Sequence, residues 1–161
     1  MSLHPTRNTL PEDIRRKSVG LLGKSLVTAI DTQRHAKQAH WNVQGPNFIA
    51  LHLLFDEVHG AAIEWADLCA ERLVALGGTA DGRIENVAEK TELTPYPLQN
   101  KDGADHVRQL ASTLAAFGHE VRESIGSSAE AGDPTTSDLF TEISRGVDEY
   151  LWKVEVHNYS K

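Results

Sequence analysis

The stretch His40-Trp41-Asn42-Val43-Gln44-Gly45-Pro46-Asn47-Phe48 decides the architecture of this chain. Pro46 disfavours helical backbone at the residue before it, so the stretch predicts a turn between two helices. Beyond the turn, His52 and Asp56 are four residues apart and therefore share one face of the second helix. His40 ends the first helix just across the turn. A histidine and a carboxylate at this spacing, with a second histidine nearby, indicate a metal site.

A second acidic pair lies farther along the same helix. Asp67 and Glu71 are again four residues apart and share a face. Along a helix, His52 and Glu71 would be about 28 Å apart, because each residue advances the axis by about 1.5 Å. Asp56 and Asp67 would be about 16 Å apart. One metal ion cannot join both pairs within one chain, so either the two pairs are unrelated sites or the second serves a neighbouring molecule.

A two-fold axis that crosses this helix antiparallel would solve the problem. It would place the first pair of one chain opposite the second pair of its partner, in an isologous contact. The midpoint falls in the small-residue stretch Gly60-Ala61-Ala62, where two helices could approach closely. The Glu-x-x-His motif of within-bundle di-iron sites does not occur at any histidine from His35 onward. Imidazole and carboxylate ligands suit iron, manganese or zinc.

Helical periodicity dominates the rest of the chain. Asp133 is a good N-cap and Pro134 a good first-turn residue for the last helix. We expect long helices over 11–43, 47–76, 102–127 and 134–156, and a short helix over 84–90. The long connection fits parallel second and third helices. We therefore predict an all-α, ferritin-like four-helix bundle with a short extra helix in that connection, as one domain over 1–161 with a tail at 1–9.

Composition excludes several classes of protein. The 161 residues carry 16 Lys plus Arg against 23 Asp plus Glu, a formal charge of −7, so no broadly basic nucleic-acid surface is expected. Cys69 is the single cysteine, which excludes an internal disulfide and a cysteine-rich zinc site. We expect it to be a buried small side chain. No segment has the apolar length of a membrane helix, and we expect a cytoplasmic protein.

Three further stretches accompany the turn: Lys37-Gln38-Ala39, Ala70-Glu71-Arg72 with Leu76-Gly77-Gly78, and the run 130–138 with Leu151-Trp152. Together with the turn and its histidines they resemble the signature of the Dps family. These mini-ferritins take their name from "DNA-binding proteins from starved cells". The similarity covers residues 10–156, and the His-x11-His-x3-Asp…Asp-x3-Glu spacing is its most specific part.

The resemblance implies a ferroxidase that stores iron and protects against oxidative stress. Twelve subunits would form a hollow shell, oxidise Fe(II) with a preference for hydrogen peroxide, and store ferric mineral inside. Two irons would occupy each ferroxidase site, which lies at the two-fold interface. The implied ligands are His40, His52 and Asp56 from one chain, with Asp67 and Glu71 from its two-fold mate.

The resemblance also suggests supporting residues. Acidic residues near the start of the last helix would line an iron-entry pore, with Asp138 the best match and Asp133 and Glu130 the weaker candidates. Trp41, beside His40, is either an electron donor to a stray oxidant or a packing residue. The alternative function is a nucleoid-associated protein that binds and protects DNA, with the metal site secondary. Only Arg7 supplies a cation in residues 1–10.

The remaining aromatic and histidine residues are expected to have ordinary roles. We expect Trp152 in the core and His106 at the surface. His35 and His59 lie near the ligand helices and are either accessory ligands or ordinary histidines.

Overall fold

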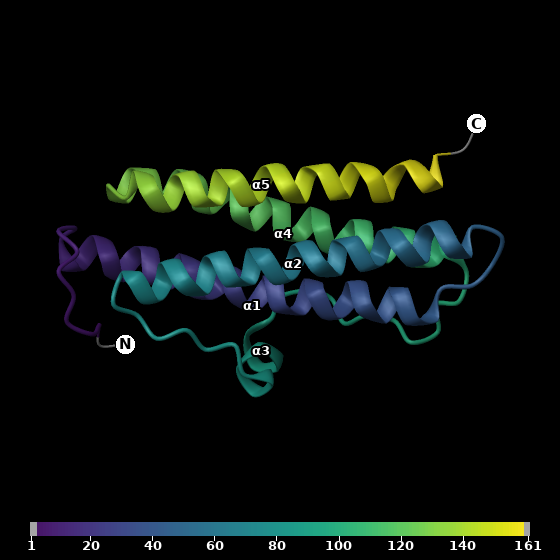
Figure 1. Cartoon of the computed structure of the whole chain (residues 1–161), viewed down its shortest axis with the longest axis horizontal. Helices are drawn as coiled ribbons and strands as arrows, with labels where there is room; N and C mark the ends of the chain where they lie inside the picture. The colour runs from purple at the N-terminus through teal and green to yellow at the C-terminus, as the bar shows by residue number, and fades with distance from the viewer. Residues whose placement is uncertain (1–2, 160–161) are drawn as a thin grey trace.

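A computed structural model describes residues 3–159 of the chain as a bundle of helices (Figure 1). Two antiparallel pairs, α1 with α2 and α4 with α5, make the most extensive contacts, and α1 also packs on α4. The all-α, ferritin-like prediction is thereby confirmed. The bounds are α1 (Glu12–Asn42), α2 (Phe48–Ala75), α3 (Ile84–Lys90), α4 (Gly103–Ala131), α5 (Pro134–Glu155) and a final 3-10 turn (Val156–Asn158).

The long connection from α2 to α4 runs along the outside of the bundle and carries α3, the short helix that the sequence predicts, which packs against α1 (Figure 1). Because this segment returns the chain to the other end of the bundle, α2 and α4 run parallel. The backbone of Gln44 meets Lys101 at the far end, where its N–H donates to the carbonyl at 3.0 Å. The connection thus fixes the turn that follows α1.

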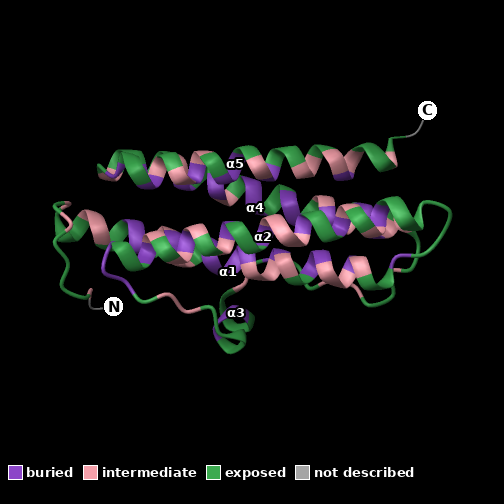
Figure 2. Cartoon of the chain, viewed as in Figure 1, coloured by how far each residue is buried: buried purple, intermediate pink, exposed green. Residues whose placement is uncertain are grey.

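The core lies along the faces that the four long helices turn toward one another, as the buried positions in Figure 2 show. Phe55, Phe117 and Phe140 are fully buried and come from α2, α4 and α5. Burying a large side chain of this kind contributes about 1.5–3 kcal/mol. Cys69 is also buried, as expected. No helix among residues 3–159 combines the length and apolar character that crossing a membrane requires.

The third long helix extends past its predicted end. We expected it to end near residue 127, but α4 continues to Ala131. Ser128 remains helical, and its hydroxyl donates to the Ser124 carbonyl one turn earlier, at 2.6 Å. Gly132 then takes a left-handed conformation, with φ of 92°, and ends the helix. The sequence prediction ended the helix at residue 127, directly after Gly126, but the helix tolerates this glycine.

Two side-chain predictions were wrong for the isolated subunit. Trp152 is 60% exposed, because it falls beside the stripe of α5 that faces the core. His106 is 1% exposed, because it lies on the buried face of α4 with Val107 and Leu110. In both cases the error concerns which face of its helix the residue lies on.

The N-terminal segment is docked on the end of α2. The His4 N–H donates to the Gly77 carbonyl at 2.6 Å, and its ring hydrogen-bonds with the Thr79 hydroxyl at 2.9 Å. Gly77 has a φ of 92°, and a Cβ there would lie 2.7 Å from the His4 carbonyl oxygen. Only glycine fits that position without movement of the chain.

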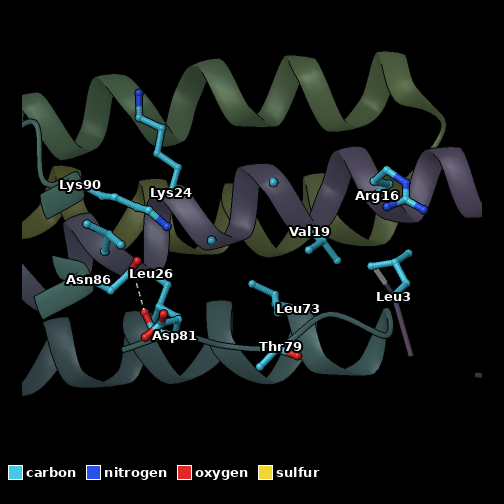
Figure 3. A pocket seen from close by; sticks show the side chains of 13 residues that line it. Leu3, Arg16, Val19, Lys24, Leu26, Leu73, Thr79, Asp81, Asn86 and Lys90 are labelled. Atoms are coloured by element: carbon cyan, nitrogen blue, oxygen red, sulfur yellow. Dashed lines mark hydrogen bonds between the residues drawn. The ribbon is translucent and has the colours of Figure 1, made fainter. Parts of the chain in front are cut away.

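A cavity of about 560 Å³ lies between α1, the end of α2 and the connection (Figure 3). Leu3, Val19 and Leu73 are among its apolar lining, and Lys24 and Lys90 are among its charged lining. None of the candidate metal ligands lines this cavity.

A buried carboxylate joins three helices at one end of the bundle. Asp133 is 0% exposed and caps α5 by accepting from the Thr136 N–H at 3.1 Å. It accepts from Ser18 of α1 at 2.8 Å and pairs with Arg72 of α2 at 2.9 Å. Burial by itself raises the pKa of Asp133, but the hydrogen bonds from Thr136 and Ser18 and the Arg72 charge outweigh it. The pKa of Asp133 is therefore below its usual value.

We expect Asp133→Asn to lower the free energy of unfolding by about 3 kcal/mol at pH 7, because it leaves the Arg72 guanidinium without its buried partner. The folded-state pKa of Asp133 is depressed, so its stabilisation is present above the unfolded pKa of about 3.9 and is lost as the pH falls through the folded value. The difference between wild type and variant should shrink below about pH 4. Urea unfolding followed by circular dichroism, at fixed protein concentration, measures both.

The control is Asp148→Asn, which removes an exposed ion pair with Arg122 at 2.7 Å. Exposed pairs contribute about 0–1 kcal/mol, so this variant should stay near wild type. Equal effects of the two substitutions would contradict the role given to Asp133.

Candidate metal centre

His40 and His52 face each other across the turn between α1 and α2. Their rings stack with centroids 3.7 Å apart and planes inclined by 21°. Each ring also contacts the other residue's backbone: His40 Nδ1 lies 2.7 Å from the His52 carbonyl oxygen, and His52 Nδ1 lies 2.9 Å from the His40 carbonyl oxygen. The two histidines are therefore held in a reciprocal pair that ties the helices together.

These contacts decide which ring nitrogens can bind a metal. A carbonyl oxygen only accepts, so Nδ1 of each ring must carry the proton and donate it. The lone pair of each neutral imidazole is then on Nε2. Metal-binding histidines generally donate their other ring N–H to a carbonyl or carboxylate in this way, which fixes the orientation of the ring. His40 and His52 thus fit the chemistry of a divalent metal site.

Asp56 lies one turn beyond His52 and completes this group, with its Oδ1 3.9 Å from His40 Nδ1. The same oxygen accepts a hydrogen bond from the Lys37 ammonium of α1. That hydrogen bond is the main reason that the pKa of the Asp56 carboxyl lies below its usual value. A metal ion that binds Asp56 must therefore displace Lys37 or share the carboxylate with it.

The other two candidate ligands lie on the same face of α2, toward its C-terminal end. Asp67 and Glu71 are exposed, and so is Ile63 between the two pairs. Positions 52, 56, 63, 67 and 71 follow one another at spacings of four or seven residues, which are about one and two helical turns, so they lie on one face of α2 as a stripe. We call it the α2 stripe. The bundle's own core lies on the opposite face, where Phe55, Val58 and Ala62 are buried.

The structure brings His40, His52 and Asp56 together and leaves Asp67 and Glu71 at the other end of the α2 stripe. Among residues 3–159, no three histidine, cysteine or acidic side chains gather closely enough to hold a metal ion. The helical rise keeps His52 and Glu71 about 28 Å apart. Each subunit therefore carries two separate groups of candidate ligands.

The ferritin-like domain family matches residues 22–158 of the chain. The "DNA protection during starvation protein" of Agrobacterium fabrum is 41% identical over all 161 residues and 99% of its own length. The solved structure of Dps from Microbacterium arborescens "in the high iron form" superimposes with a TM-score of 0.87, at 35% identity, and covers 97% of this chain and 98% of that one. The chain belongs to the Dps family.

Other Dps relatives differ in length. "DNA protection during starvation protein 2" of Deinococcus radiodurans is 31% identical over 91% of this chain, but the match spans 61% of that protein. The Agrobacterium protein, by contrast, matches end to end. The Dps family was predicted from the turn, the histidines and the acidic pairs, and the comparisons confirm it.

The acidic residues at the end of α4 and the start of α5 differ in what they can do. Asp138 and Glu130 are exposed and available to a passing cation. Asp133 is buried, and both of its oxygens accept hydrogen bonds within the subunit. The structure thus corrects the pore role for Asp133: its carboxylate caps α5 and pairs with Arg72.

The remaining candidates fall near the ligand helices. Trp41 is 60% exposed in the subunit, beside His40, so it is not a core residue. His59 Nδ1 lies 3.2 Å from the Gln33 carbonyl oxygen. His35 is buried between α1 and α4, where its Nδ1 lies 2.9 Å from the Thr113 hydroxyl, so it does not join the group at His40.

Sequence reasoning missed Lys37, which contacts the candidate ligand Asp56 directly. The signal was present, because residues three apart on a helix share a face, and Lys37 precedes His40 by three. The sequence does not give the relative axial position of α1 and α2, and this position decides that Lys37 faces Asp56.

We expect Lys37→Met to increase the affinity for a divalent probe ion, Co(II), by up to about fivefold. In the variant, the Lys37 ammonium no longer competes with the metal ion for the Asp56 carboxylate. Isothermal titration of the metal-free protein at pH 7 measures the affinity. The matched control is Lys24→Met, which removes the pair with Glu92 at 2.8 Å, away from the candidate ligands. An unchanged or lower affinity in Lys37→Met would show that Lys37 does not compete for Asp56.

Proposed function

We propose that this protein oxidises and stores iron at a centre shared between two subunits. In this proposal Fe(II) is oxidised, preferably by hydrogen peroxide, at a pair of irons bound by His40, His52 and Asp56 of one chain and Asp67 and Glu71 of its two-fold mate. The whole chain acts as one unit of a hollow shell, a dodecamer, that holds ferric mineral and works in the cytoplasm. The observation that carries the proposal is the separation of the two ligand groups along the α2 stripe.

A two-fold contact along the α2 stripe would complete both groups at once. If two copies of α2 cross antiparallel near Ala61, each His52 group meets the partner's Glu71 group. Gly60 has open space where a Cβ would stand, so nothing in the subunit itself obstructs a close approach there. Leu53 and Ile63 are large apolar side chains exposed along this helix. Their burial in a contact would favour association.

The ligand types suit the oxidation of iron. Carboxylates favour Fe(III) over Fe(II), because a harder cation prefers oxygen ligands. The neutral imidazoles of His40 and His52 bind Fe(II) without adding charge. Two irons can deliver two electrons to hydrogen peroxide, which then becomes water without releasing a hydroxyl radical. Trp41 is exposed beside His40, where its indole is placed to give an electron to a stray oxidant.

A DNA-centred function has less support in the described residues. Relatives are named for DNA protection, but the chain carries a formal charge of −7, which repels a polyanion. The N-terminal segment, which would have to act as a flexible basic arm, is held on Gly77 and Thr79 through His4. Phosphate-driven binding scales with the cations presented, and Arg7 is the only one in residues 1–10. Iron chemistry is therefore the better-supported function.

We expect His52→Ala and Glu71→Ala each to slow peroxide-driven iron oxidation by at least about a hundredfold while the shell stays assembled, since each removes a ligand from every site. Co-expression of the two variants in one shell gives the sharper test. About half of randomly formed dimers are mixed, and each mixed dimer has one complete site of two, so about a quarter of wild-type activity should return. Stopped-flow absorbance of ferric iron measures the rate.

The control is co-expression of His52→Ala with Asp56→Ala. Both substitutions fall in the same ligand group, so a mixed dimer has no complete site and activity should stay low. Recovery in this control, or none in the first pair, would rule out a site shared across the two-fold axis.

We propose that Asp138 lines the path by which iron enters the shell. Asp138→Asn should slow initial iron uptake at low ionic strength by at least about threefold, because a carboxylate raises the local concentration of cations. Assembly should be unchanged, since the substitution keeps the size of the side chain and removes only its charge. Asp148→Asn, at the other end of α5, is the charge-matched control. Equal uptake by wild type and Asp138→Asn, measured in stopped flow, would exclude Asp138 from the path.

A further inference from the structure

A cluster of buried aromatic and titratable side chains lies between α1, α4 and the connection, and the proposed iron chemistry does not use it. Tyr96 comes from the connection after α3 and is half-buried. Its ring meets His35 of α1 edge-on, with centroids 5.2 Å apart. It also lies beside the ring of His106 of α4, with centroids 5.9 Å apart and planes inclined by 20°. We call these three residues the inner aromatic cluster.

The closest contact in the inner aromatic cluster joins a phenol to an imidazole. The Tyr96 hydroxyl lies 2.7 Å from His106 Nδ1, a short and well-formed hydrogen bond. Burial lowers the pKa of His106, which keeps the imidazole neutral near pH 7. Burial also raises the pKa of the Tyr96 phenol above its ordinary value, so the phenol keeps its proton. A protonated phenol therefore rests against a neutral base.

This pair borders both helices that carry the first ligand group. The His106 ring centroid lies 6.4 Å from that of Phe55, the residue just before Asp56 on α2. The Asn42 backbone carbonyl borders the same imidazole, and Asn42 is two residues after His40 on α1. The inner aromatic cluster is thus separated from the candidate metal ligands by single packed side chains and a short piece of helix backbone.

We propose that Tyr96 and His106 form a redox pair that supplies one electron to the iron site, a role that rests on the proposed function. A phenol gives up an electron much more readily when its proton can move at the same time to a hydrogen-bonded base. Histidine suits that task, because the unperturbed pKa of its imidazole is close to neutral. The tautomer required has its proton on His106 Nε2, which leaves the Nδ1 lone pair to accept from Tyr96.

The electron count explains when such a donor is needed. Reduction of hydrogen peroxide to two waters takes two electrons and two protons from solvent. When a site holds a single Fe(II), the iron supplies one electron and becomes Fe(III), and the Tyr96 phenol supplies the other. The phenol proton passes to His106 Nδ1, which leaves a neutral tyrosyl radical and an imidazolium. No hydroxyl radical is released.

A second Fe(II) restores the pair. It gives its electron to the tyrosyl radical and becomes Fe(III), while the proton returns from His106 Nδ1 to the phenolate oxygen of Tyr96. The sum over both stages is two Fe(II) oxidised for each peroxide reduced. Tyr96 thus stores one oxidising equivalent inside the protein. Trp41 differs from Tyr96 in location, because the Trp41 indole is exposed at the subunit surface.

The test is electron paramagnetic resonance on samples frozen after hydrogen peroxide is mixed with the assembled protein loaded with one Fe(II) per site. We expect a tyrosyl signal in the wild type and its loss in Tyr96→Phe, which keeps the ring and removes only the hydroxyl. Tyr150→Phe is the matched control. The Tyr150 ring is also partly buried, against Trp65, and loss of its hydroxyl should leave the signal in place.

The role of His106 has its own variant, because Tyr96→Phe does not address the proton. His106→Gln keeps a polar side chain of similar size but cannot take up a proton near pH 7, so we expect a severalfold lower yield of radical for each iron oxidised. Ferric absorbance, recorded on the same samples, gives the iron oxidised.

The outcomes separate the two proposals. Iron oxidised in the wild type without a tyrosyl signal, or with a signal that survives in Tyr96→Phe, overturns the redox pair and leaves the proposed function intact. A radical yield that is unchanged in His106→Gln overturns the part given to His106. A wild type that oxidises no iron overturns the proposed function, and the redox pair with it.

Discussion

The length and straightness of α2 constrain how the candidate metal ligands of this protein can be arranged. A helix of 28 residues cannot fold back on itself, so two ligand groups on one of its faces stay about 28 Å apart at their outer ends. Within residues 3–159 of one subunit, neither group brings three such side chains close enough together to hold an ion. In the proposed two-fold contact, a second copy would cover the same exposed face of α2 that carries both groups of candidate ligands.

The rest of the bundle holds that helix in place at both ends. At one end, the rings and carbonyls of His40 and His52 exchange hydrogen bonds across the turn, which sets α1 against α2. At the other end, Arg72 follows Glu71 directly and pairs with buried Asp133. A charge pair buried in this way tolerates little displacement, because separating its members leaves an uncompensated charge. Both ligand groups thus sit on anchored backbone, although their own carboxylates are exposed.

Helical spacing made the fold and the candidate ligands predictable from the sequence. Positions 52, 56, 67 and 71 share a face because the repeat of a helix is local and does not depend on packing. The errors arose where a rule based on residue type alone was not sufficient to predict a helix end or the burial of a side chain. The predicted helix end at residue 127 follows Gly126, but the left-handed position that ends α4 is at Gly132. Trp152 and His106 were assigned by residue type, whereas helical phase decides burial at both positions.

By itself, the sequence determined four long helices, a crossover with its short helix, and the distance between the ligand groups, all of which follow from spacing along the chain. Only the tertiary structure decided which side chains from distant segments meet. It put Lys37 on Asp56, Asp133 between Ser18 and Arg72, and the Tyr96 hydroxyl on His106. Such contacts depend on the relative height and rotation of packed helices, which are set by the whole core at once and leave no periodic mark in the sequence.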